Sequence, residues 1–236
     1  MMYNFSPAAL SARVDAVLDA VLQQQRLVGA VVLVRQRGQD VYRRAAGLLD
    51  REAGTPMRED AVFRLASVSK PIVSTAALAL VGQHRLGLDD LVARWLPYFA
   101  PRQPDGTVAA MSVRHLLTHT AGLDYGFFQP PDGAYALARQ LGENQTAAFD
   151  LPFWPGRGFG LGFTVLTDAQ AAATPESVGS WRMGGTYGHA WFVDPAQELS
   201  VVAFTNTALE GMAGPFVMEL CQAVYGSKEA GARETP

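Results

Sequence analysis

Apolar strand patterns occupy both ends of the chain but not its middle, and this order constrains the fold more than any other feature. Residues 30–36 and 40–47 are rich in β-branched side chains around a turn at Gly38, which predicts a β-hairpin. Strand patterns return in residues 158–166, 188–194 and 199–207. Strands that flank a helical middle predict an antiparallel sheet with helices packed on it, an α+β fold.

Three helices are expected around this sheet. The first begins at Pro7 after a capping Ser6, and the last begins at Pro215 and stops at Gly226, each with apolar residues at helical spacing. Residues 67–83 form an apolar run of strong helix formers, which predicts a buried central helix. Shorter helices are expected within residues 89–99 and 112–119.

The middle of the chain predicts a reduced cap on a single domain. Residues 101–155 carry repeated proline and glycine breaks, which are typical of loops with short helices. We therefore expect one domain over residues 1–236, because 236 residues suffice for one core. Its sheet-and-helix body comprises residues 1–100 and 156–226, and residues 227–236 form a polar tail.

Composition excludes several classes of partner. The net charge of −3 and the pI of about 5.8 provide no basic surface for nucleic acid. Cys221 is the only cysteine, so an intrachain disulfide or a C-x-x-C pair is excluded, and a buried apolar role is expected for it. The sequence contains no run of about 18 apolar residues, which a membrane span would need, and no pattern of an export signal. A cytoplasmic location without membrane contact is therefore expected.

The stretch Phe63–Pro71, FRLASVSKP, carries the strongest chemical signal. Ser67 and Lys70 are three residues apart, and Pro71 requires a helix to begin at about this point. Residues spaced in this way face the same side of a helix. The N-terminus of a helix also offers unpaired N–H groups that favour developing negative charge on an oxygen.

A lysine suits this position better than an arginine. Lys70 is one of only two lysines among the 19 basic residues of the chain. A serine hydroxyl is a poor nucleophile unless a base takes its proton, and a lysine amine that is buried can serve as that base. An arginine cannot be deprotonated. The pair therefore predicts nucleophilic catalysis, although a capping serine beside a lysine also arises by chance.

The chain resembles the class C β-lactamase-related serine hydrolases, and within them the family VIII carboxylesterases. The resemblance is carried by FRLASVSKP, GLDD, LLTHTAGLDY and GGTYGHAWFVDP, in two blocks over about residues 8–140 and 152–226. It implies a β-lactamase/transpeptidase-like fold with Ser67 as the acylated nucleophile and Lys70 as its base. It also implies that Met183, Gly184 and Gly185 occupy the edge strand that lines the site.

The chain departs from this family at two places. Met183 replaces the lysine or tryptophan that is common there, which favours ester over β-lactam chemistry. Much of the helical middle lobe is missing, and with it the family's tyrosine motif for proton transfer. Tyr125 is the nearest phenol, and it is either a substitute for that tyrosine or a wall residue under the cap. Loss of the lobe exposes apolar surface, which a second subunit would cover.

Other patterns are weaker. His115 and His119 have helical metal-pair spacing, but no glutamate or third ligand accompanies them, so no metal and no cofactor is expected. His189, next to the Gly-Gly, either touches substrate or is an ordinary strand histidine. The backbone N–H groups of Ser67 and of a residue near Thr186 would hold an oxyanion.

The most consistent hypothesis is a serine hydrolase that acts on small carboxylic esters through an acyl-enzyme. Two alternatives stay open. The first is a catalytically impaired relic of the fold that binds a ligand or a partner. The second is a hydrolase of β-lactams or D-alanyl peptides. The sequence does not fix the natural substrate or the oligomeric state.

Overall fold

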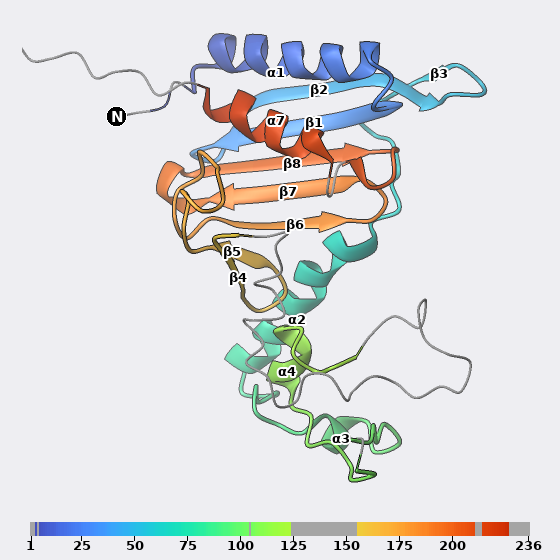
Figure 1. The fold of residues 1–236 in the computed structure, drawn as a ribbon, viewed down its shortest axis with the longest axis vertical. Helices are drawn as coiled ribbons and strands as arrows, with labels where there is room; N and C mark the ends of the chain where they lie inside the picture. Colours follow the sequence, from blue (N-terminus) through green and yellow to red (C-terminus); the bar gives the residue numbers. More distant parts are fainter. Residues whose placement is uncertain (1–2, 4, 104, 124–154, 211–213, 227–236) are drawn as a thin grey trace, which may run out of the picture. The chain divides into compact units, whose positions relative to one another are not determined.

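The computed structural model describes residues 3, 5–103, 105–123, 155–210 and 214–226 (Figure 1). The chain divides into two compact units: the sheet unit, with residues 1–69 and 165–236, and the middle unit, with residues 70–164. The boundary between the two units falls at Lys70. From the sequence, all of residues 1–100 were expected to belong to the sheet-and-helix body. The helix that follows Ser67 therefore belongs to the middle unit.

The sheet is antiparallel and joins the two ends of the chain. Its strands are β1 (Gly29–Gln36), β2 (Gln39–Asp50), β3 (Thr55–Pro56), β4 (Arg157–Phe159), β5 (Thr164–Leu166), β6 (Trp181–Gly185), β7 (His189–Asp194) and β8 (Leu199–Thr205). Their order is β3-β2-β1-β8-β7-β6-β5-β4. Strand β1 pairs with β2 on one side and with β8 on the other. The predicted hairpin and the predicted α+β class are both confirmed.

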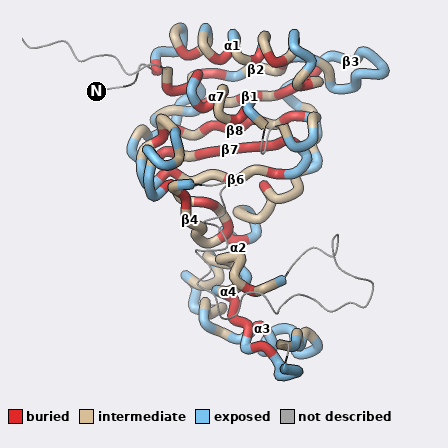
Figure 2. Tube along the Cα trace, viewed as in Figure 1, coloured by how far each residue is buried: buried red, intermediate tan, exposed pale blue. Residues whose placement is uncertain are grey.

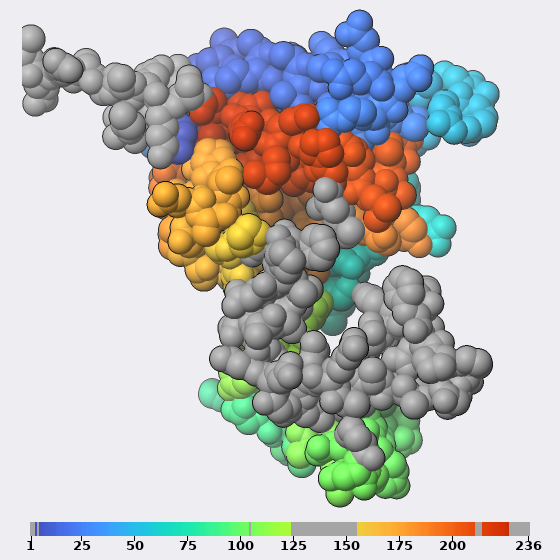
Figure 3. Space-filling model, viewed as in Figure 1, coloured from blue at the N-terminus to red at the C-terminus, as the bar shows by residue number. Residues whose placement is uncertain are grey.

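Helices α1 (Pro7–Gln23) and α7 (Pro215–Tyr225) lie side by side on one face of this sheet (Figures 1 and 3). The core lies between them and strands β1, β2, β7 and β8, where Figure 2 colours buried residues red. Leu10, Leu18 and Phe216 are completely buried there. Burial of each such side chain contributes about 1.5–3 kcal/mol. Cys221 is also fully buried in this core, as expected from the sequence.

A buried carboxylate ties β7 to α7. Asp194 is fully buried and accepts hydrogen bonds from the Ser177 and Ala196 N–H groups and from the Tyr225 hydroxyl. Burial, and then the hydrogen bond to Asp194, raises the pKa of the Tyr225 hydroxyl far above its ordinary value. Because a buried carboxylate needs such donors, this contact fixes the C-terminal helix on the sheet.

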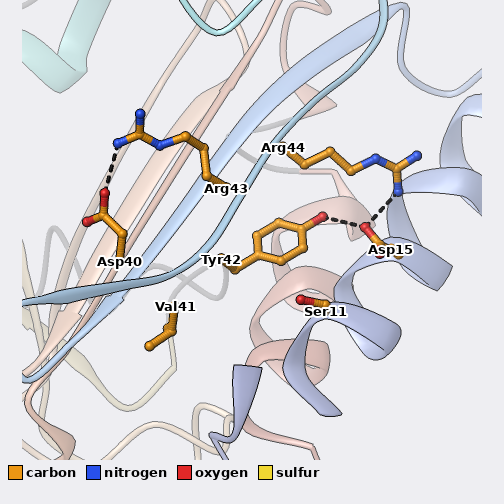
Figure 4. Close-up of a pocket in the computed structure, with 7 residues that line it drawn as sticks. All are labelled: Ser11, Asp15, Asp40, Val41, Tyr42, Arg43 and Arg44. Carbon is orange, nitrogen blue, oxygen red and sulfur yellow. Dashed lines mark hydrogen bonds and ion pairs between the residues drawn. The ribbon is translucent and has the colours of Figure 1, made fainter. Parts of the chain in front are cut away.

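A shallow hollow between α1 and β2 is lined by side chains that pair with one another (Figure 4). The Tyr42 hydroxyl donates to Asp15 Oδ1 at 2.7 Å, and Arg44 donates to the same oxygen at 2.8 Å and also contacts Asp19. Burial opposes ionisation of Asp15, but these two hydrogen bonds and the charge of Arg44 lower the pKa of its carboxyl overall. These contacts of Asp15 and Asp19 with Tyr42 and Arg44 hold α1 on β2, and we call them the polar clasp.

Asp15→Asn tests this clasp. A depressed pKa means that the ionised carboxylate stabilises the fold above the ordinary pKa of 3.8, and that this stability is lost as pH falls through the folded value. We expect the variant to have a Tm about 1–3 °C lower at pH 7. The difference from wild type should shrink at pH 3 in thermal unfolding followed by circular dichroism. A difference that is independent of pH would contradict the clasp.

The middle unit contains α2 (Lys70–Gly82), α3 (Val92–Trp95), α4 (Val113–Leu117) and β4. Val92, Met111 and Ala121 form its small apolar cluster. The sequence predicts that α2 is buried, but Ile72 and Val73 are 63% and 66% exposed, so that prediction is wrong for this face. The residues that the structure describes contain no layer over these two side chains. Within the same residues, no helix is long and apolar enough to cross a membrane.

The single strand predicted over residues 158–166 is two short strands. Strands β4 and β5 are joined by a tight turn in which the Gly160 N–H donates to the Phe163 carbonyl and the Gly162 N–H donates to the Gly160 carbonyl. Gly162 has φ +100°, a conformation that favours glycine. The alternating glycines therefore mark a turn as well as strand, which periodicity alone does not distinguish.

Candidate active site

Ser67 lies in a short 3-10 turn, η1 (Ala66–Ser69), that runs directly into α2. Lys70 is the first residue of α2. In a 3-10 turn, side chains three residues apart lie on the same side of the backbone. The helical start expected at Ser67 is therefore present, and both residues are half-buried.

The backbone immediately before Ser67 is strained. Ala66 has φ +51°, in the left-handed region that residues with a β-carbon seldom adopt. The Ser69 hydroxyl donates to the Ala66 carbonyl at 2.7 Å and closes the turn. Strain of this kind costs about 1–3 kcal/mol and persists only where the surrounding structure enforces it. Such positions are concentrated at functional sites, which supports the choice of Ser67.

The end of β6 contacts this turn. A β-carbon on Gly185 would lie 2.8 Å from the Leu65 carbonyl oxygen and 3.4 Å from the Val68 backbone nitrogen. Only glycine permits this approach. The structure therefore brings Gly185 to the segment that carries Ser67. Thr186, which follows, is exposed.

The other β6 residues differ in how far they are buried. Met183 is 6% exposed and Gly184 is half-buried. Because strand residues alternate between faces, Met183 shares the face of Gly185. Contact of Met183, Gly184 or Thr186 with a substrate stays a prediction.

His189 lies behind the same segment, on β7. It is 1% exposed, its Nε2 lies 2.7 Å from the Arg64 carbonyl oxygen, and its Nδ1 lies 3.2 Å from the Thr205 backbone nitrogen. The Phe63 and Phe204 rings pack against it at centroid distances of 5.4 and 5.0 Å. Burial lowers the pKa of His189, and the contact with the Arg64 carbonyl partly offsets this. Of the two roles left open by the sequence, this geometry favours the strand histidine over one that touches substrate.

His119, in the middle unit, lies close to Lys70. The His119 ring stacks on Phe159 at a centroid distance of 4.4 Å. Burial, and then the positive charge of Lys70, lower the pKa of His119. The turn after Phe159 returns to α2, where a β-carbon on Gly162 would lie 2.2 Å from Ser74 Oγ. His119 thus lies near Lys70, and Gly162 lies against Ser74, in the first turns of α2.

Sequence reasoning placed His119 on a helix with His115, and the structure explains the error. Helix α4 ends at Leu117, and His119 follows it with φ +57°. His115 Nδ1 instead accepts the Ser112 N–H, as part of the cap at the start of α4. Within the described residues no three potential metal ligands form a cluster. Only the position of His119 just past a helix end could have indicated its separate role.

Tyr125 lies outside the described residues, so its proposed part as a phenol stays a prediction. The aromatic residues Phe127, Phe128, Phe153 and Trp154 also lie outside the described residues.

Comparison with known proteins agrees with the fold and with a chain shortened in its middle. The family model described as Beta-lactamase matches residues 14–141, more than half of the chain. Esterase EstB of Burkholderia gladioli is 32% identical over 380 aligned positions that include 94% of this chain and 97% of EstB. Because 380 exceeds the 236 residues here, a long internal segment of EstB has no counterpart. This agrees with the missing lobe.

Solved structures show the same fold. The hydrolase EstCE1, described as having promiscuous acyltransferase activity, has a TM-score of 0.83 and 28% identity, with 94% of this chain and 100% of that chain covered. A class C β-lactamase has a TM-score of 0.69 at 15% identity over 95% of this chain and 99% of its own, which supports the fold alone. The fold and these similarities together define the class, the β-lactamase-fold serine hydrolases.

The chain belongs to the β-lactamase family, in a form shortened in its middle. Its relatives and structural neighbours include esterases and acyltransferases. Among the latter is a methylbutanoyltransferase of Penicillium citrinum, 32% identical over 52% of this chain and 34% of its own length.

Proposed function

We propose that this protein is a serine hydrolase that cleaves small carboxylic esters through an acyl-enzyme on Ser67, with Lys70 as the base. The observation that carries the proposal is the continuous helical backbone from η1 into α2, on which Ser67 follows the strained Ala66 and precedes Lys70 by one turn. The identity with esterase EstB over both ends of the chain supports the ester as substrate class.

The proposed reaction uses these two side chains and backbone donors. The Ser67 hydroxyl oxygen attacks the ester carbonyl carbon while its proton passes to the Lys70 amine. The tetrahedral oxyanion collapses, the bond to the alkoxide breaks, and the proton on Lys70 leaves with the alcohol. Water then attacks the acyl-enzyme carbonyl and gives one proton to Lys70. The bond from the acyl carbon to Ser67 Oγ breaks, the proton on Lys70 returns to that oxygen, and the carboxylic acid leaves.

Backbone N–H groups of Ser67 and Thr186 are our candidates for the oxyanion site. Gly185 immediately precedes Thr186, and its approach to Leu65 and Val68 brings the end of β6 beside η1. Donors that are fixed before the reaction stabilise the developing charge without reorganisation. The close packing of Gly185 would keep this pair of donors fixed.

The acyl-enzyme has two possible acceptors. Water gives hydrolysis, whereas an alcohol gives acyl transfer, the activity in the descriptions of EstCE1 and of the Penicillium protein. A β-lactam would acylate the same serine, but Met183 offers no positive charge to a substrate carboxylate. We therefore expect p-nitrophenyl esters to be turned over faster than nitrocefin.

The proposal is tested with a fluorophosphonate and with p-nitrophenyl acetate and butyrate. The intact mass should rise by one adduct, peptide mapping should locate it on Ser67, and labelled protein should no longer release p-nitrophenol. Ser67→Ala is the reference without a nucleophile, and Ser69→Ala is the matched serine control on the same turn. Folded wild-type protein that takes no label, or takes it at another serine, would refute the hydrolase.

The exposed face of α2 favours a second candidate, a relic of the fold that binds a ligand or a partner. Ile72 and Val73 are more than 60% exposed on an apolar helix, and EstB has an internal segment that this chain lacks. Exposed apolar surface of this kind marks interaction sites. Folded protein without any labelling, together with self-association that Ile72→Ser abolishes, would favour this candidate.

A further inference from the structure

His189 joins two parts of the sheet unit through backbone groups on opposite sides of its ring. On one side it contacts the Arg64 carbonyl, in the segment that leads to Ser67. On the other side it contacts the Thr205 N–H at the end of β8. The rings of Phe63 and Phe204 enclose it, and only 1% of its surface is exposed.

The partners of the ring fix its tautomer. The Thr205 backbone nitrogen can only donate, so Nδ1 of His189 must carry a lone pair. The proton of the neutral ring is then on Nε2, which donates to the Arg64 carbonyl oxygen at 2.7 Å. A protonated ring would direct an N–H at the Thr205 N–H. The arrangement therefore requires neutral imidazole with the proton on Nε2.

The Arg64 carbonyl is two residues before the left-handed Ala66 and three before Ser67. A left-handed alanine persists only where its neighbours hold it. Gly185 packs against Leu65 and Val68, and His189 holds the carbonyl just before them. We propose that His189 is a positioning residue for Ser67: its Nε2–H anchors the Arg64 carbonyl, and this anchor holds the turn that presents the nucleophile.

This inference rests on the proposed acyl-enzyme at Ser67, but it assigns His189 no contact with substrate. The contacts of the ring within the described residues are with backbone and aromatic groups. Phe63, Phe204 and the two backbone groups surround it, and the nearby charged side chain, Arg64, directs its guanidinium over the Tyr187 ring at 5.0 Å. Burial lowers the pKa of His189, which favours the neutral ring at pH 7.

Two amide variants separate the two contacts of the ring. His189→Gln places an amide N–H near the Nε2 position and keeps the donor to Arg64, whereas His189→Asn places an oxygen near Nδ1 and keeps only the acceptor for Thr205. We expect His189→Asn to acylate Ser67 about 10–100-fold more slowly with little change in KM, because small misplacements of a nucleophile have effects of this size. His189→Gln should recover most of the rate.

Rates are compared only for variants that are folded by circular dichroism at the assay temperature. His189→Asn that acylates at the wild-type rate would overturn the positioning role, as would equal losses in both variants. Long-range ¹H–¹⁵N NMR of the wild type at pH 7 provides a readout independent of any variant. We expect the Nε2–H tautomer, and a charged ring or the Nδ1–H tautomer would overturn the inference.

The two proposals fail in different ways. If wild-type protein takes no fluorophosphonate, the hydrolase itself is refuted, whatever the tautomer of His189. If wild-type protein is labelled at Ser67 and His189→Asn is labelled just as fast, only the positioning role is lost.

Discussion

Lys70→Ala is expected to slow acylation of Ser67 by about 10²–10⁴-fold, the usual contribution of a general base. The variant retains Ser67 and the turn at Ala66, so substrate binding should change less than the chemical step. Lys70→Arg should not restore the rate, because a guanidinium cannot accept the serine proton. The measurement is the rate of fluorophosphonate labelling, followed by intact mass over time.

The chain contains its own control for this prediction. Lys228 is the other lysine, and Lys228→Ala removes the same charge and the same side chain from the polar tail. It should label as fast as wild type. If Lys70→Arg retained half of the wild-type rate, the residue would act through its charge, and another base would be needed.

Local patterns predicted those parts of the fold that depend on local rules. Pro215 and Gly226 bounded the last helix correctly because proline suits a first turn and glycine suits a stop. The β1–β2 hairpin followed from β-branched residues around Gly38. In each case the residues that decide the structure are adjacent in sequence.

The parts that failed depend on contacts between distant residues. The partners of His189, Arg64 and Thr205, are not indicated by the residues near it in the sequence. Strand alternation predicts the face of the sheet on which a side chain lies, but not the groups that pack against it. The apolar pattern of α2 predicts burial, but burial needs a covering layer. The sequence predicts that Ser67 and Lys70 act as a pair, but it does not indicate the left-handed Ala66 before them.

Gly185→Ala is expected to have the second large effect. Its β-carbon would lie 2.8 Å from the Leu65 carbonyl oxygen, closer than real contacts allow, so β6 or η1 must move. The backbone atoms that it meets belong to the turn around Ser67, and backbone yields less easily than a side chain. We expect a loss of about 1–3 kcal/mol in unfolding free energy. Acylation of Ser67 should slow by about 10²-fold.

Gly82→Ala is the matched substitution, because a β-carbon at Gly82, the last residue of α2, meets no atom within 4 Å. This variant should unfold and acylate like wild type. Urea unfolding and the labelling rate are measured for both variants. A destabilised Gly185→Ala that still labels at the wild-type rate would show that the contact of β6 with η1 supports the fold but does not position Ser67. Loss of both properties in Gly185→Ala alone would show that the close approach of β6 sets the position of the nucleophile.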